Sequence, residues 1–462
     1  MPAKTLFTFI VTAVVACGFA MVNSAVGQTS DTVIYSFCDN FPACPDGAFP
    51  YGGLAISPSG DLYGTTYGGG GGEGCNGSGC GSVFRLRRTS VSATNGWTEK
   101  VLHGFYSFPN DGFFPYAGVT LDHAGNVYGT TIEGGNSNSS CNTASCGVVF
   151  ELTPSAGDEW TETILYAFCS AEGCSDGVGP VGNLIFDAAG NLYGTTGTGG
   201  TVQQHCTYGC GTVFELSPGA HGSWTEKVLY RFSYAKGANP LASLVFDSAG
   251  NLYGTTAQGG VNGIGTVFEL TPGSNGTWTE TTLHMFNTTD GRVPQSSLII
   301  DGAGNLYGTT FLGGTGAGCI YSYGCGTVFE VSPGPNGTWS EQVLYNFCSD
   351  TFCADGANPW GGLVAGANGV LYGTTDNGGD NNVGVLFKLT FNTTWNESLV
   401  YNFGTTNYDS FNSQAGLIVD AQGNLYGTGE AGGRSTNCNE FQGCGAVFVF
   451  SPDANAEPNG RR

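Results

Sequence analysis

Basic residues are scarce in this chain. Its 462 residues include 13 Lys and Arg against 36 Asp and Glu, which gives a formal net charge of -23. A surface of this charge repels the phosphates of nucleic acids and the headgroups of anionic lipids. We therefore expect no nucleic-acid partner and no binding to an anionic membrane surface.

Long apolar runs are scarce as well. The run from Leu6 to Val22 is the one that approaches the ~20 residues of a membrane span. It follows a lysine and precedes the small residues Ala25 and Gly27, an order typical of a cleaved export signal. We predict a signal peptide at 1–27, no membrane span in the mature chain, and a secreted, periplasmic or cell-surface product. Lipid attachment at Cys17 is the alternative interpretation, because small and apolar residues precede that cysteine.

Local catalytic motifs are also missing. The sequence contains no G-x-S-x-G nucleophile elbow, no phosphate-binding loop and no HExxH, and it has only five histidines. Charged residues make up only 11% of the chain, whereas 13% is aromatic and 79 residues are glycine. This composition differs from that of disordered proteins and favours a globular protein rich in strands and turns.

Cysteine, in contrast, is plentiful. Besides Cys17 there are sixteen cysteines in eight close pairs: Cys38/Cys44, Cys75/Cys80, Cys141/Cys146, Cys169/Cys174, Cys206/Cys210, Cys319/Cys325, Cys348/Cys353 and Cys438/Cys444. An even number of cysteines in an exported chain predicts disulfides that hold short loops. Zinc is the weaker alternative, because isolated cysteine pairs are a weak indication of a zinc site.

The motif "GNLYGTT" and its near copies recur seven times. Its tyrosine is found at Tyr63, Tyr128, Tyr193, Tyr253, Tyr307, Tyr372 and Tyr426, at intervals of 54 to 65 residues. Each copy belongs to a unit of four strand-like segments; in the third unit these are 183–187, 192–196, 211–218 and 224–232. Gly and Asn between the first two segments supply the turn of a hairpin.

Seven units of four strands predict an all-β, seven-bladed β-propeller, because radial packing covers the faces of small sheets and limits their exposed edges. The last unit stops after its third strand, whereas the mature chain opens with "TVIYSF", Thr32 to Phe37, which matches a fourth strand. We expect this N-terminal strand to complete the last blade and close the ring. The predicted domain is 28–452, followed by a disordered tail at 453–462.

The ordered motifs "VLYNF", "DGANP", "GNLYGTT", "GG" and "GTVFEL" resemble the GloVer tandem-repeat family of exported bacterial proteins, often called choice-of-anchor proteins. The resemblance covers Thr32 to Pro452. It implies a secreted or surface-attached propeller, and it implies no particular reaction.

The propeller order places the loops after the second strands and the loops between blades on one face, here called the top face. All eight cysteine pairs fall in these loops, so we expect function there. The loops between blades repeat Asp-Gly-x-x-Pro, with aspartates at Asp46, Asp111, Asp176, Asp290 and Asp355. A ring of carboxylates could bind Ca²⁺, but the repetition favours a role of each Asp within its own turn. We therefore predict no cofactor, with Ca²⁺ as the alternative.

Aromatic residues in the same loops are distributed unevenly among the blades. They are Phe49, Tyr51, Phe113, Phe114, Tyr116 and Trp360. Aromatic rings near carboxylates suit a sugar, and we predict a monomeric, non-catalytic protein that binds an extracellular glycan there, with Glu133 and Glu430 as polar contacts. Packing between blades is the alternative role of Tyr51 and Trp360, because they align with Val181 and Leu241.

Two other functions stay open. A glycoside hydrolase or polysaccharide lyase would use carboxylates at unique loop positions: Glu133, Asp376, Asp380, Glu430 or Glu440. A structural envelope or adhesion module would use none of them. His103 and His284 replace the strand tyrosine of other units, so we interpret both as structural.

Overall fold

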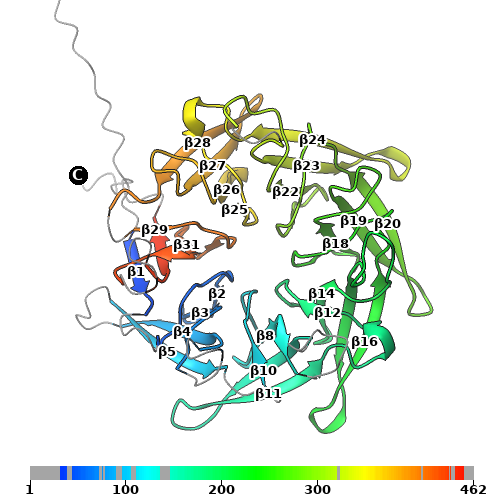
Figure 1. Ribbon diagram of the computed structural model, residues 1–462, viewed down its shortest axis with the longest axis vertical. Coiled ribbons are helices and arrows are strands. Elements are labelled where there is room, and N and C mark those ends of the chain that lie inside the picture. The colour runs from blue at the N-terminus through cyan, green and yellow to red at the C-terminus, as the bar shows by residue number, and fades with distance from the viewer. Residues whose placement is uncertain are drawn as a thin grey trace, which may run out of the picture.

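The computed structural model describes residues 32–38, 44–71, 75, 79–89, 96–105, 111–135, 146–319, 323–406, 409–435, 438 and 443–451. Seven antiparallel sheets surround a central axis, as Figure 1 shows. The predicted fold is confirmed, because each sheet contributes the four main strands of one blade. The predicted signal peptide and C-terminal tail lie outside the described residues.

The blades are numbered in chain order, and the strands of each blade are given from the axis outward. Blade one contains β2 (Ala55–Ile56), β3 (Leu62–Thr66), β4 (Ser82–Arg88) and β5 (Trp97–Gly104). Blade two contains β7 (Thr120–Leu121), β8 (Val127–Thr131), β10 (Val148–Pro154) and β11 (Trp160–Ala167). Blade three contains β13 (Ile185–Phe186), β14 (Leu192–Thr198), β15 (Thr212–Pro218) and β16 (Trp224–Arg231). Blade four contains β17 (Val245–Phe246), β18 (Leu252–Thr256), β19 (Thr266–Pro272) and β20 (Trp278–Met285).

The remaining blades follow the same order. Blade five contains β21 (Ile299–Ile300), β22 (Leu306–Thr310), β23 (Thr327–Pro333) and β24 (Trp339–Asn346). Blade six contains β25 (Val364–Ala365), β26 (Leu371–Thr374), β27 (Val385–Phe391) and β28 (Trp395–Asn402). Blade seven contains β30 (Ile418–Val419), β31 (Leu425–Gly429), β33 (Ala446–Phe450) and the N-terminal strand β1 (Thr32–Ser36).

Short elements occupy the loops. The strand β12 (Val178–Pro180) adds to β14, and two small ribbons pair β6 (Gly112–Phe113) with β9 (Glu133–Gly134) and β29 (Ser410–Phe411) with β32 (Ala431–Gly432). The described helical segments are single 3₁₀ turns: η3 (Glu172–Cys174), η4 (Ala220–Gly222), η5 (Pro335–Gly337), η6 (Thr351–Cys353) and η7 (Ala367–Gly369). Among the described residues, no helix is long and apolar enough to cross a membrane.

The repeated motif explains the inner part of each blade. In blade three, a Cβ added to Gly194 would lie 2.5 Å from Cζ of Phe214, so only glycine leaves room for that ring. Phe214 is completely buried. Thr195 Oγ1 donates to the carbonyl of Ala242 in blade four at 3.0 Å, and Thr196 Oγ1 lies 2.9 Å from Thr212 Oγ1. The motif therefore builds the core of one blade and its contact with the next.

Aromatic contacts join neighbouring blades. The ring of Tyr193 in blade three packs edge-on against Phe246 and Trp278 of blade four, at centroid distances of 5.1 and 6.4 Å. The equivalent Tyr128 makes the same contacts with Phe186 and Trp224 of blade three. These contacts assign the tryptophans that begin the outer strands to packing between blades.

The N-terminal strand is part of the last sheet. Thr32 of β1 is paired with Val449 of β33, and Ser36 with Ala446. Blade seven in turn contacts blade one, because Thr428 Oγ1 donates to the carbonyl of Gly52 at 3.1 Å. In Figure 1, β1 and β31 accordingly lie in the same blade, beside the strands of blade one.

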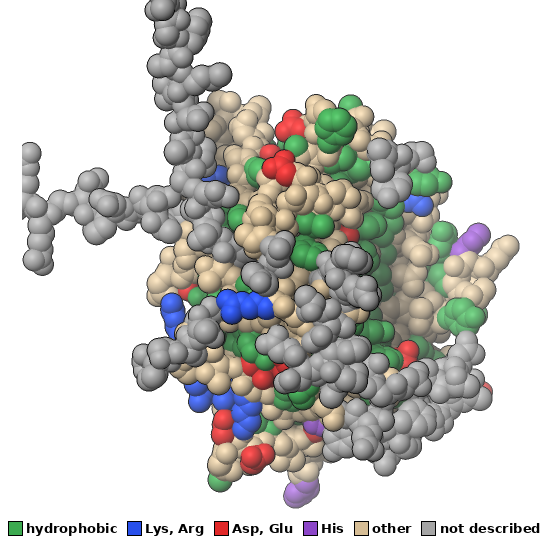
Figure 2. Space-filling model, turned by 60° about the vertical axis from the view of Figure 1, so that its left-hand side comes forward, with side chains coloured by type: hydrophobic (Ala, Val, Ile, Leu, Met, Phe, Trp, Pro, Cys, Tyr) green, Lys and Arg blue, Asp and Glu red, His purple; other side chains and the backbone are tan. Residues whose placement is uncertain are grey.

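The side chains on the surface are mostly uncharged. Figure 2 shows basic and acidic side chains in a few small groups on the face it presents. Arg85 and Lys100 of blade one both bind the carboxylate of Asp158, which leaves little unpaired positive charge there.

Candidate functional site

The loops of the top face lie side by side, as the strand order predicted. Each loop between blades is bridged to the loop after the next second strand: Ala48 pairs with Gly68, Ala238 with Gln258, and Ala357 with Asn377. In blades two and seven the same pairing forms the ribbons β6–β9 and β29–β32. The top face is therefore a layer of paired loops held on a rigid ring.

One backbone position fixes where these loops turn toward the axis. In six blades this position directly precedes the recurring Pro, and in blade seven it precedes Ser413. The residue there has a positive φ in every blade: Phe49, Phe114, Gly179, Asn239, Val293, Asn358 and Asn412. Asparagine suits this left-handed conformation. Asn239 Nδ2 also donates to the carbonyl of Gly197 at 2.8 Å. Phenylalanine and valine at this position carry backbone strain, which a rigid loop layer must hold in place.

A cavity of about 220 Å³ lies on the axis and is lined by residues of all seven blades. The upper part of its wall consists of the residues that follow this turn: Tyr51, Tyr116, Val181, Leu241, Gln295, Trp360 and Gln414. Mostly small residues form the wall below them. A Cβ added to Gly52, for example, would lie 2.6 Å from the backbone of Ala117, so the neighbouring segments approach too closely for larger side chains.

A second ring of variable residues contacts the first. These residues directly follow the seven copies of the repeated motif and are Tyr67, Ile132, Gly197, Ala257, Phe311, Asp376 and Glu430. Phe311 packs edge-on against Trp360 at 4.9 Å, and Glu430 Oε1 accepts a hydrogen bond from the Tyr51 hydroxyl at 2.9 Å. The identity of the residue after each motif therefore sets the chemistry of the cavity mouth.

Blades one and two contribute an aromatic cluster. Tyr51 and Tyr116 are stacked with centroids 5.2 Å apart and an interplanar angle of 24°, and Tyr67 packs edge-on against Tyr51 at 5.3 Å. Phe114 stacks on Tyr67 at 4.7 Å. Burial and the nearby Glu430 carboxyl raise the pKa of Tyr116 to about 12. These phenols are therefore neutral hydrogen-bond donors at physiological pH.

Blades six and seven contribute two carboxyls. Glu430 Oε2 accepts a hydrogen bond from Gln414 Nε2 at 2.8 Å, so its two oxygens bind one phenol and one amide. Burial raises the pKa of Glu430, and the Tyr51 hydrogen bond opposes that rise. Burial also raises the pKa of Asp376, whose Oδ2 accepts from Asn377 Nδ2 at 2.9 Å. Electrostatic repulsion from Asp376 adds a smaller contribution to the rise in the pKa of Glu430.

The cavity mouth has two unlike sides. Blades three and four supply small or aliphatic side chains at both rings, namely Val181, Gly197, Leu241 and Ala257. The other blades supply mostly aromatic, amide and carboxyl groups. A ligand on the axis would thus meet polar donors and flat rings on one side and an aliphatic wall on the other.

The predicted site residues separate into two sets. Tyr51, Tyr116 and Trp360 line the cavity, in the same ring as Val181 and Leu241, and Glu430 bonds directly to Tyr51. The other predicted residues do not line it. Phe113 and Glu133 are paired between β6 and β9, and Phe49 packs against the blade core. Phe114 stacks on Tyr67, and Asp380 is exposed. Glu440 lies outside the described residues.

Four residues of the cavity mouth were not predicted from the sequence: Tyr67, Phe311, Gln295 and Gln414. These residues could have been found by comparing the repeats with one another. The residue after the motif and the residue two positions after the left-handed turn differ in nearly every blade. Which of these residues face each other follows only from the ring.

The repeated aspartates bind within their own loops. Asp176 Oδ2 accepts from the Tyr166 hydroxyl and the Ser170 N–H, both at 2.8 Å. Asp355 Oδ2 makes the same two contacts with Tyr345 and Ser349, at 2.7 and 2.9 Å. This geometry accounts for the repeated Asp as a part of the turn. Binding of Ca²⁺ there stays a prediction.

Seven of the eight predicted disulfides lie within the described residues, and all seven join the predicted partners. They are Cys38–Cys44, Cys75–Cys80, Cys169–Cys174, Cys206–Cys210, Cys319–Cys325, Cys348–Cys353 and Cys438–Cys444. The eighth prediction, Cys141 with Cys146, involves Cys141, which lies outside the described residues.

The disulfides hold short loops, as predicted, and some of their sulfurs are also buried in the core. Cys80 is 3% exposed and packs in the core between blades one and two, beside Val83 and Phe105. Cys210 is completely buried and packs with Val213 and Phe232. Each of these cysteines lies two residues before the third strand of its blade. The disulfide therefore anchors its loop in the apolar core, and its sulfurs form no part of the cavity wall.

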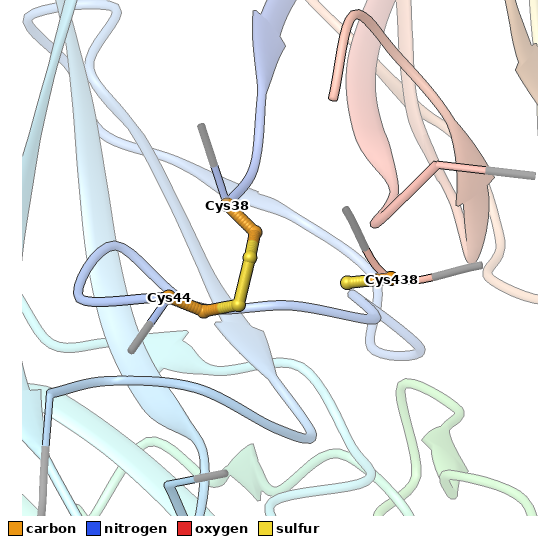
Figure 3. Close-up of side chains that lie close together, drawn as sticks. All are labelled: Cys38, Cys44 and Cys438. Atoms are coloured by element: carbon orange, nitrogen blue, oxygen red, sulfur yellow. A yellow bond between two sulfur atoms is a disulfide. The ribbon is translucent and has the colours of Figure 1, made fainter. Parts of the chain in front are cut away.

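Loops that are distant in sequence bring some of these disulfides close together. Figure 3 shows Cys438 close to the Cys38–Cys44 disulfide, although Cys438 itself is bonded to Cys444. The same arrangement recurs where Cys348 approaches the Cys319–Cys325 disulfide. These contacts join a loop between blades to the loop after a second strand.

Comparison with solved structures finds distant similarity. A protein of unknown function from Dyadobacter fermentans aligns over 92% of this chain and 98% of its own, at 10% identity and a TM-score of 0.42. An ancestral GH74 enzyme aligns over 89% of this chain and 49% of its own, at 10% identity and a TM-score of 0.47. A gluconolactonase from Xanthomonas campestris aligns over 75% of this chain and 86% of its own, at 12% identity and a TM-score of 0.37. At these values the similarities carry no information about activity.

Comparison with curated proteins finds no match. The model of the Gloeobacter/Verrucomicrobia repeat, however, matches residues 23–204 and 200–441. These ranges include the seven copies of the repeated motif, and the match agrees with the resemblance to GloVer tandem-repeat proteins. The chain belongs to the Gloeobacter/Verrucomicrobia repeat family.

Proposed function

We propose that this protein binds an extracellular glycan at the mouth of its central cavity and catalyses no reaction on it. The observation that carries the proposal is the convergence on the axis of aromatic rings, amides and carboxyls from five blades. Sugar rings present C–H faces that stack on aromatic side chains, and their hydroxyls need hydrogen-bond partners such as Glu430, Gln414 and Gln295. The cavity wall supplies aromatic rings and the amides of Gln295 and Gln414, and the Glu430 carboxyl binds two of the wall residues.

The volume of the cavity limits the size of the ligand that can enter it. Its volume of about 220 Å³ is below the ~300 Å³ at which pockets for drug-sized ligands begin. We therefore expect one sugar residue or one chain end to enter, while the rest of a longer glycan lies across the top face.

The disulfides support an extracellular setting. Such bonds persist in oxidising compartments, and they are concentrated in the loops that surround the cavity mouth. Secretion through the predicted signal peptide and a monomeric state belong to the same proposal.

The test is binding of the purified mature chain to a glycan array, followed by titration of each hit with the free oligosaccharide. Aromatic stacking contributes about 0.5–1.5 kcal/mol per ring, so Trp360→Ala and Tyr116→Ala should each weaken binding roughly 2- to 10-fold, and more together. Phe352→Ala is the matched control, since Phe352 is a top-face aromatic residue that is 91% exposed and absent from the cavity wall. Glycan binding that both cavity variants leave unchanged would remove the proposed site. No glycan binding at all would favour a structural envelope or adhesion module.

A second candidate function is hydrolysis or elimination on a polysaccharide. The observation that favours it is the presence of two carboxyls at the cavity mouth, Asp376 and Glu430, whose pKa values are raised mainly by burial, as a general acid requires. Release of reducing ends or unsaturated products from a polysaccharide panel, lost in Glu430→Gln and in Asp376→Asn, would replace the binding proposal with this one.

A further inference from the structure

A second set of polar residues repeats between the blades, outside the central cavity. At three of the seven interfaces between blades an outer-strand tyrosine donates to the Asp of the following loop, and a Glu of the next blade lies beside that Asp; these sets are Tyr35/Asp46/Glu99, Tyr166/Asp176/Glu226 and Tyr345/Asp355/Glu397. Between blades two and three, Tyr166 of β11 donates to Asp176 Oδ2 at 2.8 Å, and Glu226 of β16 is close enough for Asp176 to raise its pKa. The outer strands β11 and β16 are in contact, so the Glu comes from the neighbouring blade.

Histidine replaces the tyrosine at two of these positions. His284 of β20 lies 3.3 Å from Asp290 Oδ2, measured from Nε2, and Glu341 of β24 completes the group. In the other group, His103 Nε2 lies 3.4 Å from Asp111 Oδ2 and 3.7 Å from Glu162 Oε2. In each group the three potential ligand atoms all lie within 4.8 Å of one another.

The group around His284 contains buried polar atoms that the described residues do not satisfy. His284 Nε2 and Glu341 Oε1 are inaccessible to solvent and have no hydrogen-bond partner among them. Glu162 Oε1 of the other group also has no partner among the described residues, as do Glu226 Oε1 and Glu397 Oε1 at tyrosine positions, so the atom that distinguishes the His284 group is the histidine nitrogen. Buried polar atoms without partners are rare in proteins, and a bound ion can satisfy such atoms. Asp290 itself is held in place, because the backbone N–H of Asn287 donates to its Oδ1 at 2.8 Å and the Asn287 side-chain amide donates to its Oδ2.

We propose that each of these two groups binds one divalent transition-metal ion, with zinc as the best fit, through His284, Asp290 and Glu341 and through His103, Asp111 and Glu162. One imidazole nitrogen and two carboxylate oxygens form a ligand set that zinc accepts, with water at the fourth position. Tetrahedral zinc with bonds of about 2.0–2.1 Å separates its ligand atoms by about 3.4 Å. The 3.3 and 3.4 Å separations between His and Asp atoms match this value.

The tyrosine positions should not bind the metal. A phenol binds a divalent ion well only after it loses its proton, and Tyr166 and Tyr345 keep that proton and donate it to the Asp at 2.8 and 2.7 Å. The ligands of each His group come from two adjacent blades. A bound ion would therefore tie blade one to blade two and blade four to blade five.

The competing explanation is a protonated imidazole that forms an ion pair with the two carboxyls. The two explanations differ in one measurable respect: only a metal site gives a fixed stoichiometry that follows the histidines. The mature chain is dialysed against EDTA, then against buffer, and titrated with ZnCl₂ by calorimetry while bound zinc is measured by elemental analysis. We expect two zinc ions per wild-type chain.

The chain supplies its own matched variants. His284→Tyr and His103→Tyr introduce the residue that the other positions already use, so each variant should keep the fold and bind one zinc, and the double variant should bind none. Tyr166→His should create a third site with Asp176 and Glu226 and raise the stoichiometry to three. His221→Tyr is the control for surface binding, because His221 lies in the exposed turn η4.

Each outcome decides the proposal. Zinc that the double His→Tyr variant still binds would overturn it, as would a wild-type dissociation constant weaker than ~100 µM. If a tyrosine variant failed to fold by circular dichroism, Glu341→Gln and Glu162→Gln would replace it, with the same loss of one ion each expected. Cobalt bound in place of zinc gives a visible absorption spectrum. The proposal requires that this absorption also be lost in the same variants.

Discussion

Ionisation of Glu226 should destabilise the folded protein, and Glu226→Gln should remove that effect. Burial, aided by the neighbouring Asp176, raises the pKa of Glu226 from 4.5 to about 7. Its Oε1 is buried and has no hydrogen-bond partner among the described residues. The folded protein therefore holds a proton on this carboxyl that the unfolded chain releases.

The direction in which stability changes with pH follows from the number of protons that each state binds. Below pH 4.5 the carboxyl is protonated in both states, and its contribution to stability is fully present. As the pH rises from 4.5 to about 7, the unfolded chain binds fewer protons than the folded protein, so the free energy of unfolding falls. A change in pKa from 4.5 to about 7 corresponds to at most about 3.4 kcal/mol, at 1.36 kcal/mol per pKa unit. Partial exposure screens the carboxyl, so we expect about 1–2 kcal/mol.

The assay is urea unfolding followed by tryptophan fluorescence at pH 4 and at pH 8. The free energy of unfolding of Glu226→Gln should be close to that of the wild type at pH 4 and higher by about 1–2 kcal/mol at pH 8, because glutamine cannot ionise. Glu159→Gln is the control, since Glu159 lies in an exposed turn. A variant that is less stable than the wild type at pH 8, or a difference that does not change with pH, would refute the reasoning.

Three further outcomes test the fold. Phe214→Ala should lower the free energy of unfolding by about 3–5 kcal/mol in urea titrations, because Phe214 is completely buried in blade three; a cost below about 1 kcal/mol would contradict this packing. Gly194→Ala should lower it by about 1–3 kcal/mol, because the added methyl group would overlap the Phe214 ring. Gly302→Ala is the control, because a Cβ there meets nothing within 4 Å and Gly302 is not among the residues with positive φ. Deletion of Thr32–Ser36 exposes the edge of β33 and should produce oligomers in size-exclusion chromatography; a monomer with unchanged stability would show that β1 is dispensable.

The fold was predictable because the chain repeats it seven times. Each residue of the repeated motif has one structural task, such as the space that Gly194 leaves for Phe214 or the hydrogen bond from Thr195 to the next blade. Because seven copies agree, the repeated pattern predicts the strands more reliably than the sequence of any one strand would. The same agreement explains why disulfide partners such as Cys206 and Cys210, only 4 residues apart, could be assigned from spacing. Spacing did not show that Cys210 would be buried in the core.

The site was predictable only in part. Uneven aromatic residues pointed to Tyr51, Tyr116 and Trp360, but the same argument also selected Phe49 and Phe113, which pack away from the cavity. Local spacing does not show which side of a loop faces the axis. It also cannot join Glu430 to Tyr51, which are 379 residues apart in sequence and come together because blade seven is next to blade one.

The histidines illustrate the same limit. The sequence identified His103 and His284 as replacements of a strand tyrosine, which is correct for their position. Their neighbours Glu162 and Glu341 follow the regular pattern of the next blade, so the sequence does not indicate that they contact a histidine. Only the packing of adjacent blades brings the three residues of each group together.

The most direct test of the central proposal is a crystal structure of the mature chain with an oligosaccharide chosen from the glycan array. The account predicts density for a sugar ring on the axis, stacked on Trp360 or Tyr116 and hydrogen-bonded to Glu430 or Gln414. Sugar density confined to the outer strands, with the cavity mouth unchanged, would contradict it.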